Sequence, residues 1–150
     1  MTGFRRKARI VALQTLYEVD CSTHSPEDSL AHSMPERMLP KETVDFSKGL
    51  ISGVLQNKQD IDDTILKFAP AFPIKQISII DRNILRLAIF EILFDNKVPV
   101  KAVINEAVEL AKSFGSDTSQ KFINGVLGSI IANCMRQEES QKPVDGNKRA

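Results

Sequence analysis

The sequence lacks tryptophan, has one tyrosine and contains only two cysteines among its 150 residues. Cys21 and Cys134 lie far apart, which excludes a disulfide framework and favours a reducing compartment, so we expect a cytoplasmic protein. The two histidines lie in a polar stretch and form no metal-binding pattern, so no metal is expected. Because no apolar run approaches the ~18 residues of a membrane span, and because polar residues interrupt the basic N-terminus, neither a membrane helix nor a secretory signal is expected.

Common catalytic motifs are absent as well. The chain has no GxxxxGK[ST] loop, no GxGxxG fingerprint, no HExxH and no GxSxG. Adjacent acids such as Asp62 and Asp63 diverge on a helix, so they read as solvated surface rather than as an acid–base pair. We therefore expect a binding protein without a cofactor, and not an enzyme.

Strand signals are nearly absent, whereas helical periodicity recurs along the chain. The fold class predicted is all-α, with about seven helices in two small packed bundles. Helices are expected at about residues 4–20, 26–32, 42–57, 61–68, 79–95, 99–113 and 117–136.

The two prolines of the segment 69–73, APAFP, predict a stiff boundary between two halves. The domain predicted is 1–136, with an N-terminal bundle at about 4–69 and a C-terminal bundle at about 74–136. The polar remainder, 137–150, is expected to be disordered.

Local signals refine the C-terminal half. Ser78 and Asp81 have the spacing of a helix-capping box, and the helix that follows is apolar almost all round, which is typical of a central buried helix. Gly115 is expected to end a helix in a left-handed conformation. Gly125 and Gly128 lie three apart within the last helix, and we expect another helix to approach them closely.

The first helix has an unusual charge layout. Arg5, Arg6, Lys7 and Arg9 crowd its start, and no acid follows until Glu18. A helix N-terminus carries a partial positive charge, so cations there are disfavoured by about 0.3–1 kcal/mol each. Cations and free N–H groups together predict a phosphate site on a chain whose net charge is only +1. The alternative is that the basic start is merely solvated.

Two further features point to ligand contact. Lys121 and Phe122 place a cation beside an aromatic ring, the usual platform for an unstacked base. Periodicity alone instead assigns Phe122 to the core stripe of the last helix. Arg86, with Arg82 one turn before it, either pairs internally or reaches the surface, and Arg86 is retained as a candidate RNA contact.

Three collinear stretches together resemble one family, the bacterial antitermination factor NusB. They are RRKARIVALQTLYEVD, IDRNILRLAIFEIL and VPVKAVINEAVELAKSFGSDTSQKFINGVLGSI. The resemblance covers about residues 4–134. Two positions depart from the family pattern, since Gly128 replaces an acid and Phe90 stands where tyrosine is common.

The resemblance implies a helical fold of two three-helix bundles, without catalysis or metal. It implies that the protein binds the boxA element of nascent ribosomal RNA, as a single strand, together with ribosomal protein NusE in the transcription elongation complex. It implies a partner-binding role for Asp81. It implies RNA contact for Arg5, Arg6, Lys7, Arg9, Tyr17, Lys121, Phe122 and Asn124.

Two rival interpretations stay open at this point. One is a protein-binding helical adaptor whose basic start meets an acidic partner without RNA. The other is a helper domain of an RNA-modifying enzyme. A homodimer that covers the basic helix until a partner competes for it is also left open.

Overall fold

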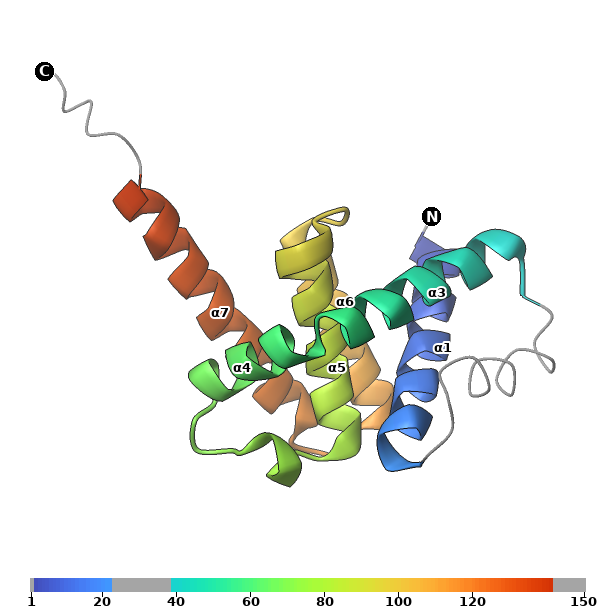
Figure 1. Cartoon of the computed structure of the whole chain (residues 1–150), viewed down its shortest axis with the longest axis horizontal. Helices are drawn as coiled ribbons and strands as arrows, with labels where there is room; N and C mark the ends of the chain where they lie inside the picture. Colours follow the sequence, from blue (N-terminus) through green and yellow to red (C-terminus); the bar gives the residue numbers. More distant parts are fainter. Residues whose placement is uncertain (1, 23–38, 142–150) are drawn as a thin grey trace, which may run out of the picture.

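The computed structural model describes residues 2–22 and 39–141, and within them every regular element is helical, which confirms the all-α prediction (Figure 1). The α-helices are α1 (Thr2–Cys21), α3 (Lys41–Gln56), α4 (Lys58–Phe68), α5 (Ile79–Ile89), α6 (Val100–Phe114) and α7 (Ser119–Gln141). The 3₁₀ turn η1 (Ile74–Gln76) precedes α5, and the π-helix η2 (Phe90–Asp95) follows it. The helix expected at 26–32 and the segment 142–150 lie outside the described residues, whereas residues 137–141, which were expected to be disordered, form the end of α7.

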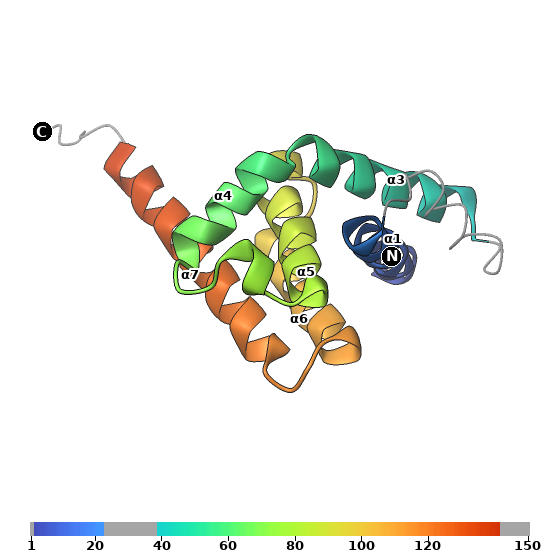
Figure 2. The ribbon, with the colours of Figure 1, turned by 60° about the horizontal axis from the view of Figure 1, so that its bottom comes forward.

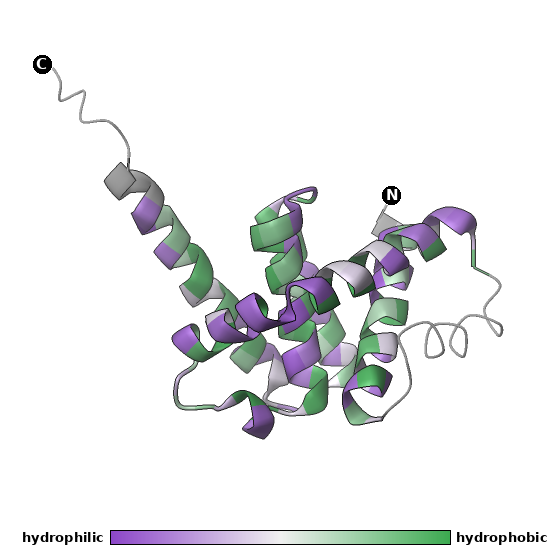
Figure 3. Cartoon of the chain, viewed as in Figure 1, coloured by the Kyte–Doolittle hydropathy of each residue, from purple (hydrophilic) through white to green (hydrophobic). Residues whose placement is uncertain are grey.

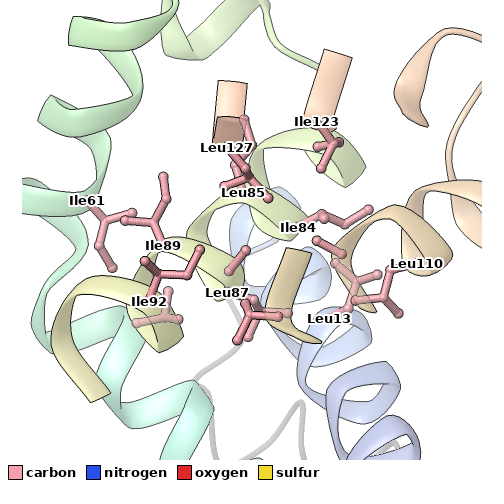
Figure 4. Packing of buried hydrophobic residues seen from close by; sticks show 14 of the residues in the cluster. Leu13, Ile61, Ile84, Leu85, Leu87, Ile89, Ile92, Leu110, Ile123 and Leu127 are labelled. Atoms are coloured by element: carbon pink, nitrogen blue, oxygen red, sulfur yellow. The ribbon is translucent and has the colours of Figure 1, made fainter. Parts of the chain in front are cut away.

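Helix α5 is central, as its apolar circumference predicts. It contacts α1, α6, α4 and α7, and both ribbon views show it enclosed by the other helices (Figures 1 and 2). Ile84, Leu85 and Ile89 are completely buried, and they pack with Leu13 of α1, Leu110 of α6 and side chains of α7 in one continuous core (Figure 4). Hydrophobic and hydrophilic residues alternate along the helices around α5 (Figure 3).

Helix α1 lies between α3 and α5, so it is covered on two sides (Figure 2). The hydroxyl of Ser47 on α3 donates to the carbonyl of Ala8 across a distance of 2.6 Å, and both residues are buried. Helix α7 packs on α6, α5 and α4, and its C-terminal end projects beyond the other helices in both views.

The ends of α5 show one expected and one unexpected feature. The side chain of Ser78 accepts from the backbone N–H of Asp81 at 3.1 Å, which confirms the predicted cap. At the other end the expected single helix 79–95 changes to η2, where the N–H of Asn96 donates to the carbonyl of Glu91 at 3.0 Å, five residues back. Asn96 then ends the π-helix in the left-handed region, with φ of 58°. Short π-helices of this kind occur frequently at functional sites.

Two predictions about glycines are wrong. Gly115 ends α6 in an extended conformation, with φ of −93° and ψ of −168°, so no left-handed cap forms there. A methyl group at Gly115 would instead collide with the side chain of Ser119. Gly125 and Gly128 are exposed, and no atom lies within 4 Å of the place where a Cβ would stand. No helix of the described chain therefore approaches them closely.

Gly53 of α3 is the glycine that a close approach requires. A Cβ there would overlap the ring of Phe90, the first residue of η2. Gly49, one turn earlier on the same helix, is exposed and has no atom within 4 Å of its Cβ position. The two glycines thus form a matched pair that differs only in what faces them.

We expect Gly49→Ala to stabilise the fold by about 0.5–1 kcal/mol, because alanine restricts the unfolded chain and favours the helix. We expect Gly53→Ala to destabilise it by about 1–3 kcal/mol, the usual range for overpacking. Urea unfolding of both variants tests the pair. Stabilisation by Gly53→Ala equal to that by Gly49→Ala would show that the Phe90 ring moves aside without cost.

Candidate nucleic-acid interface

The four cations at the start of α1 have different environments. Arg9 is only 4% exposed, and its Nε and Nη2 donate to the two carboxylate oxygens of Glu91 in η2 at 2.7 and 2.8 Å. Arg6 makes the same bidentate arrangement with Glu106 of α6, at 3.0 and 2.8 Å, but its side chain is 51% exposed. The prediction that Arg9 offers its charge to RNA is therefore corrected, because its guanidinium is buried and already paired.

The other two cations have no carboxylate partner in the described part of the chain. The guanidinium of Arg5 lies over the rings of Phe4 and Phe46, at 5.8 and 5.5 Å from their centroids. Such cation–π contacts favour Arg5 lying along α3 rather than extending into solvent. Lys7 is exposed, and its ammonium group makes no hydrogen bond or ion pair within residues 2–22 and 39–141. The charge available at the start of α1 thus comes from Lys7, from the outer edge of Arg6 and from the half-buried Arg5.

The Arg6–Glu106 pair is electrostatically well matched. The hydrogen bonds from Arg6, followed by its charge, lower the pKa of Glu106, although burial acts in the opposite direction. The same hydrogen bonds raise the pKa of Arg6. Both groups are therefore charged at neutral pH. Only Nε and one N–H of Nη2 are used, so three of the five N–H groups of Arg6 stay available.

Residues from three helices surround the exposed side of this pair. A hollow of about 850 Å³, here called the amide hollow, brings Arg6 together with Lys121 and Asn124 of α7. Its lining is Arg6, Asn105, Glu106, Val108, Glu109, Gln120, Lys121 and Asn124. Three RNA-binding candidates from opposite ends of the chain thus meet on one surface. Tyr17 lies farther along α1, where it is 39% exposed. The eleven residues from Arg6 correspond to about three helical turns, which puts Tyr17 on nearly the same side of α1.

A second hollow, of about 400 Å³, adjoins the first and is here called the Asp81 hollow. Its lining is Phe72, Gln76, Ile77, Ser78, Asp81, Thr118, Lys121 and Phe122. Phe122 is half-buried: it packs against the core and meets the ring of Phe72 edge to face, with centroids 5.4 Å apart. Lys121 lines both hollows, so the two surfaces are continuous.

Asp81 is the unsatisfied group of this second hollow. The residue is 8% exposed, and its buried Oδ1 has no hydrogen-bond partner in the described chain. Leaving a buried acceptor unpaired costs about 1–3 kcal/mol, and more for a charged one. Beside it, Phe72 exposes half of its surface. An unpaired acceptor next to an exposed ring is a surface suited to a partner that brings a donor.

Arg86 does not belong to either hollow. It is 5% exposed, pairs bidentately with Asp62 of α4, and donates through Nη1 to Asp20 at 3.0 Å. Arg82 adds a bidentate pair to the same Asp20, at 2.7 and 2.8 Å, and Asn83 donates to it as well. The prediction that Arg86 contacts RNA is corrected, because all of its charge is used inside the fold, joining α1, α4 and α5.

Asp20 is the centre of that network. Burial alone would raise the pKa of its carboxyl, but hydrogen bonds from Arg82 and Asn83 and the charges of both arginines outweigh burial and hold the pKa well below its ordinary value. Asp62, expected on the solvated surface, instead pairs with Arg86. Sequence reasoning also missed Asp20 as the partner of Arg82 and Arg86, Glu91 as the partner of Arg9 and Glu106 as the partner of Arg6. No local pattern identifies them, because each pair joins residues 62 to 100 positions apart.

Comparison with known proteins shows which family has this sequence and fold. The model of the NusB family matches residues 6–132. The chain belongs to the NusB family. Transcription antitermination protein NusB of Dehalococcoides mccartyi (strain CBDB1) is 51% identical over 142 residues, which cover 93% of this chain and 99% of that protein. The same protein of Bacillus pumilus is 40% identical over 134 residues, covering 89% and 98%.

Solved NusB structures share the fold. T. maritima NusB superimposes with a TM-score of 0.78 at 32% identity, covering 84% of this chain and 89% of that one. A chain from the crystal structure of antitermination factors NusB and NusE in complex with dsRNA gives a TM-score of 0.81 at 27% identity, covering 89% and 99%. The NusB family acts in transcription antitermination, a regulatory and not a catalytic role. Among the described residues, no helix is both long and apolar enough to cross a bilayer.

We expect Arg9→Ala to destabilise the protein by about 3–5 kcal/mol, because it leaves the Glu91 carboxylate buried and unpaired. The double variant Arg9→Met with Glu91→Leu should recover most of that loss, since apolar side chains of similar volume often replace a buried pair without cost. Chemical denaturation measures both. If Arg9→Ala alone unfolds at the wild-type denaturant concentration, the pair contributes nothing to the fold.

The Asp20 network predicts a pH dependence of known sign. Because folding lowers the pKa of Asp20, its contribution is fully present above the unfolded value of about 3.9 and is lost as pH falls below it. We expect Asp20→Asn to lower the free energy of unfolding by about 3 kcal/mol at pH 7. The difference from wild type should shrink steadily below about pH 4. A difference that stays constant with pH would assign the effect to packing.

Proposed function

We propose that this protein is an RNA-binding antitermination factor that binds boxA-type single-stranded RNA of nascent ribosomal transcripts together with NusE. It then acts within the transcription elongation complex, in the cytoplasm, and supports processive transcription of ribosomal RNA operons. The solved relative in complex with NusE and dsRNA supports NusE and RNA as partner classes, since its fold matches over most of this chain.

The observation that carries the RNA half of the proposal is the amide hollow. Arg6 from the start of the chain and Lys121 and Asn124 from α7 line the same surface, although more than one hundred residues separate them in sequence. Cations, amides and a neighbouring aromatic ring are the groups that bind single-stranded RNA. Cations bind its phosphates, amides form hydrogen bonds with the edges of its bases, and aromatic rings stack on the faces of its bases. Phe122 lies next to the hollow and supplies that ring.

The Asp81 hollow is the proposed contact for NusE. A buried carboxylate oxygen without a donor favours a partner that brings a basic or N–H group, and the exposed Phe72 offers apolar area beside it. Because Lys121 borders both hollows, RNA and protein partner would meet there. Such adjacency suits a joint complex better than two independent ones.

The proposed RNA contacts differ in the charge they contribute. Single-stranded RNA binding weakens with salt by a slope of about −0.7 per phosphate neutralised in a plot of log affinity against log salt. Lys7 and Lys121 are exposed cations without carboxylate partners in the described chain, so each should account for one phosphate. Lys48 is also exposed and lies on α3, which covers α1 away from α6 and α7, so it serves as the control (Figure 2).

We expect Lys7→Ala and Lys121→Ala each to reduce the magnitude of the salt slope for boxA RNA by about 0.7, with unchanged thermal stability. Lys48→Ala should leave the slope unchanged. Gel-shift titrations at several salt concentrations, with and without NusE, measure this. Binding of NusE without any affinity for RNA would favour the adaptor interpretation, and unchanged slopes in all three variants would place the RNA elsewhere.

A further inference from the structure

The amide hollow holds more polar groups than phosphate binding needs. Asn105 of α6 and Gln120 and Asn124 of α7 line it, and none of their side chains has a hydrogen-bond partner in the described part of the chain. Glu109, also on the lining, is exposed and its carboxylate is likewise without a hydrogen bond there. Three amides and one carboxylate therefore present free donors and acceptors to the same space.

The charges of the hollow cancel. Arg6 and Lys121 are positive, whereas Glu106 and Glu109 are negative, so the four formal charges sum to zero. Non-specific RNA binding depends on phosphates meeting net positive charge. A lining of this kind adds little to that attraction, and its carboxylates repel a phosphate placed in the middle. The chemistry suits a neutral group rich in hydrogen-bonding edges, which in RNA is a nucleobase.

The lining also selects among bases. A carboxylate only accepts hydrogen bonds, and it recognises the exocyclic amino group of cytosine; an amide pairs with edges that offer both a donor and an acceptor. Cytosine presents an amino group where uracil presents a carbonyl oxygen. Against uracil, Glu109 would face an acceptor with an acceptor. The volume of about 850 Å³ lies within the ~300–1,000 Å³ of small-molecule sites.

Arg6 positions the nucleotide that carries such a base. Glu106 holds Nε and Nη2 of Arg6 from one side, at 3.0 and 2.8 Å, and so fixes the plane of this guanidinium in the lining of the hollow. The remaining N–H groups of Arg6 are those available to a phosphate. A phosphate bound there would share the hollow with the amides, which line the same space. Glu106 is in this arrangement a positioning residue.

We infer that the amide hollow is a base-reading pocket, in which Asn105 and Glu109, with the α7 amides, bind one unstacked base carrying an exocyclic amino group and reject uracil. The inference rests on the proposed RNA-binding function and deepens it. It assigns specificity to α6, from which neither the charge pattern nor the family resemblance names an RNA contact.

Oligocytidine and oligouridine of equal length test the pocket, because they carry the same number of phosphates. We expect the wild-type protein to bind oligocytidine more tightly by about tenfold, or about 1.4 kcal/mol. Asn105→Ala combined with Glu109→Ala should reduce this ratio to near one. The ratio is the readout, because removal of a carboxylate raises affinity for both RNAs alike. Both positions are exposed, so the variant should melt like wild type.

Lys7→Ala is the matched control. It should weaken both RNAs equally and leave their ratio unchanged, since it removes a phosphate contact and not a base contact. Wild-type protein that binds both RNAs equally, or a double variant that keeps the full preference, overturns the base-reading pocket alone. Failure of the wild-type protein to bind either RNA or boxA RNA, with NusE present, overturns the proposed function itself.

Discussion

The attachment of α1 to the central helix by guanidinium–carboxylate pairs is the constraint on which the rest of the structure depends. Near the start of α1, Arg9 pairs with Glu91 beyond the end of α5; near its end, Asp20 pairs with Arg82 and Arg86 at the beginning and middle of α5. The two helices are therefore antiparallel, and the charges are reversed between the two attachments. A helix shifted by one turn would leave buried charges unpaired, which costs several kcal/mol. This fixes α1 in register as well as in place.

That attachment gives the cations at the start of α1 a structural role. Cations at a helix N-terminus are disfavoured by the helix dipole, and an outside polyanion is one way to compensate. The fold itself supplies part of the compensation, because Glu91 and Glu106 neutralise Arg9 and Arg6. Arg5, Lys7 and the outer edge of Arg6 are left for a ligand, and Arg5 also lies over the rings of Phe4 and Phe46. Two cations of the cluster therefore stabilise the fold, and the surface proposed to bind RNA is less positive than the sequence alone indicates.

The sequence predicted what depends on neighbouring residues. The bounds of α1 and α3, the start of α5, the Ser78 cap and the burial of α5 follow from periodicity and capping chemistry, whereas the change to η2 at Phe90 does not. It could not predict what depends on distant residues. The spacing of Arg82 and Arg86 is the same whether they bind RNA or an internal carboxylate, and the partner Asp20 lies 66 positions away from Arg86. The glycines show the same limit, since Gly53 and Gly125 differ only in whether Phe90 or solvent faces them.

The candidate site follows the same division. Arg6, Lys121 and Asn124 were predicted separately, and the fold brings them to one hollow; Asn105 and Glu109 carried no signal because a polar residue on an amphipathic helix is ordinarily solvated surface. With a net charge of +1 and few free cations on this face, phosphate attraction alone gives modest affinity. Under the proposed function, selectivity comes from hydrogen bonds to bases and from the protein partner proposed for the adjoining Asp81 hollow. A nearly neutral protein that recognises one RNA element among many transcripts is consistent with that distribution, because bulk charge would bind them all.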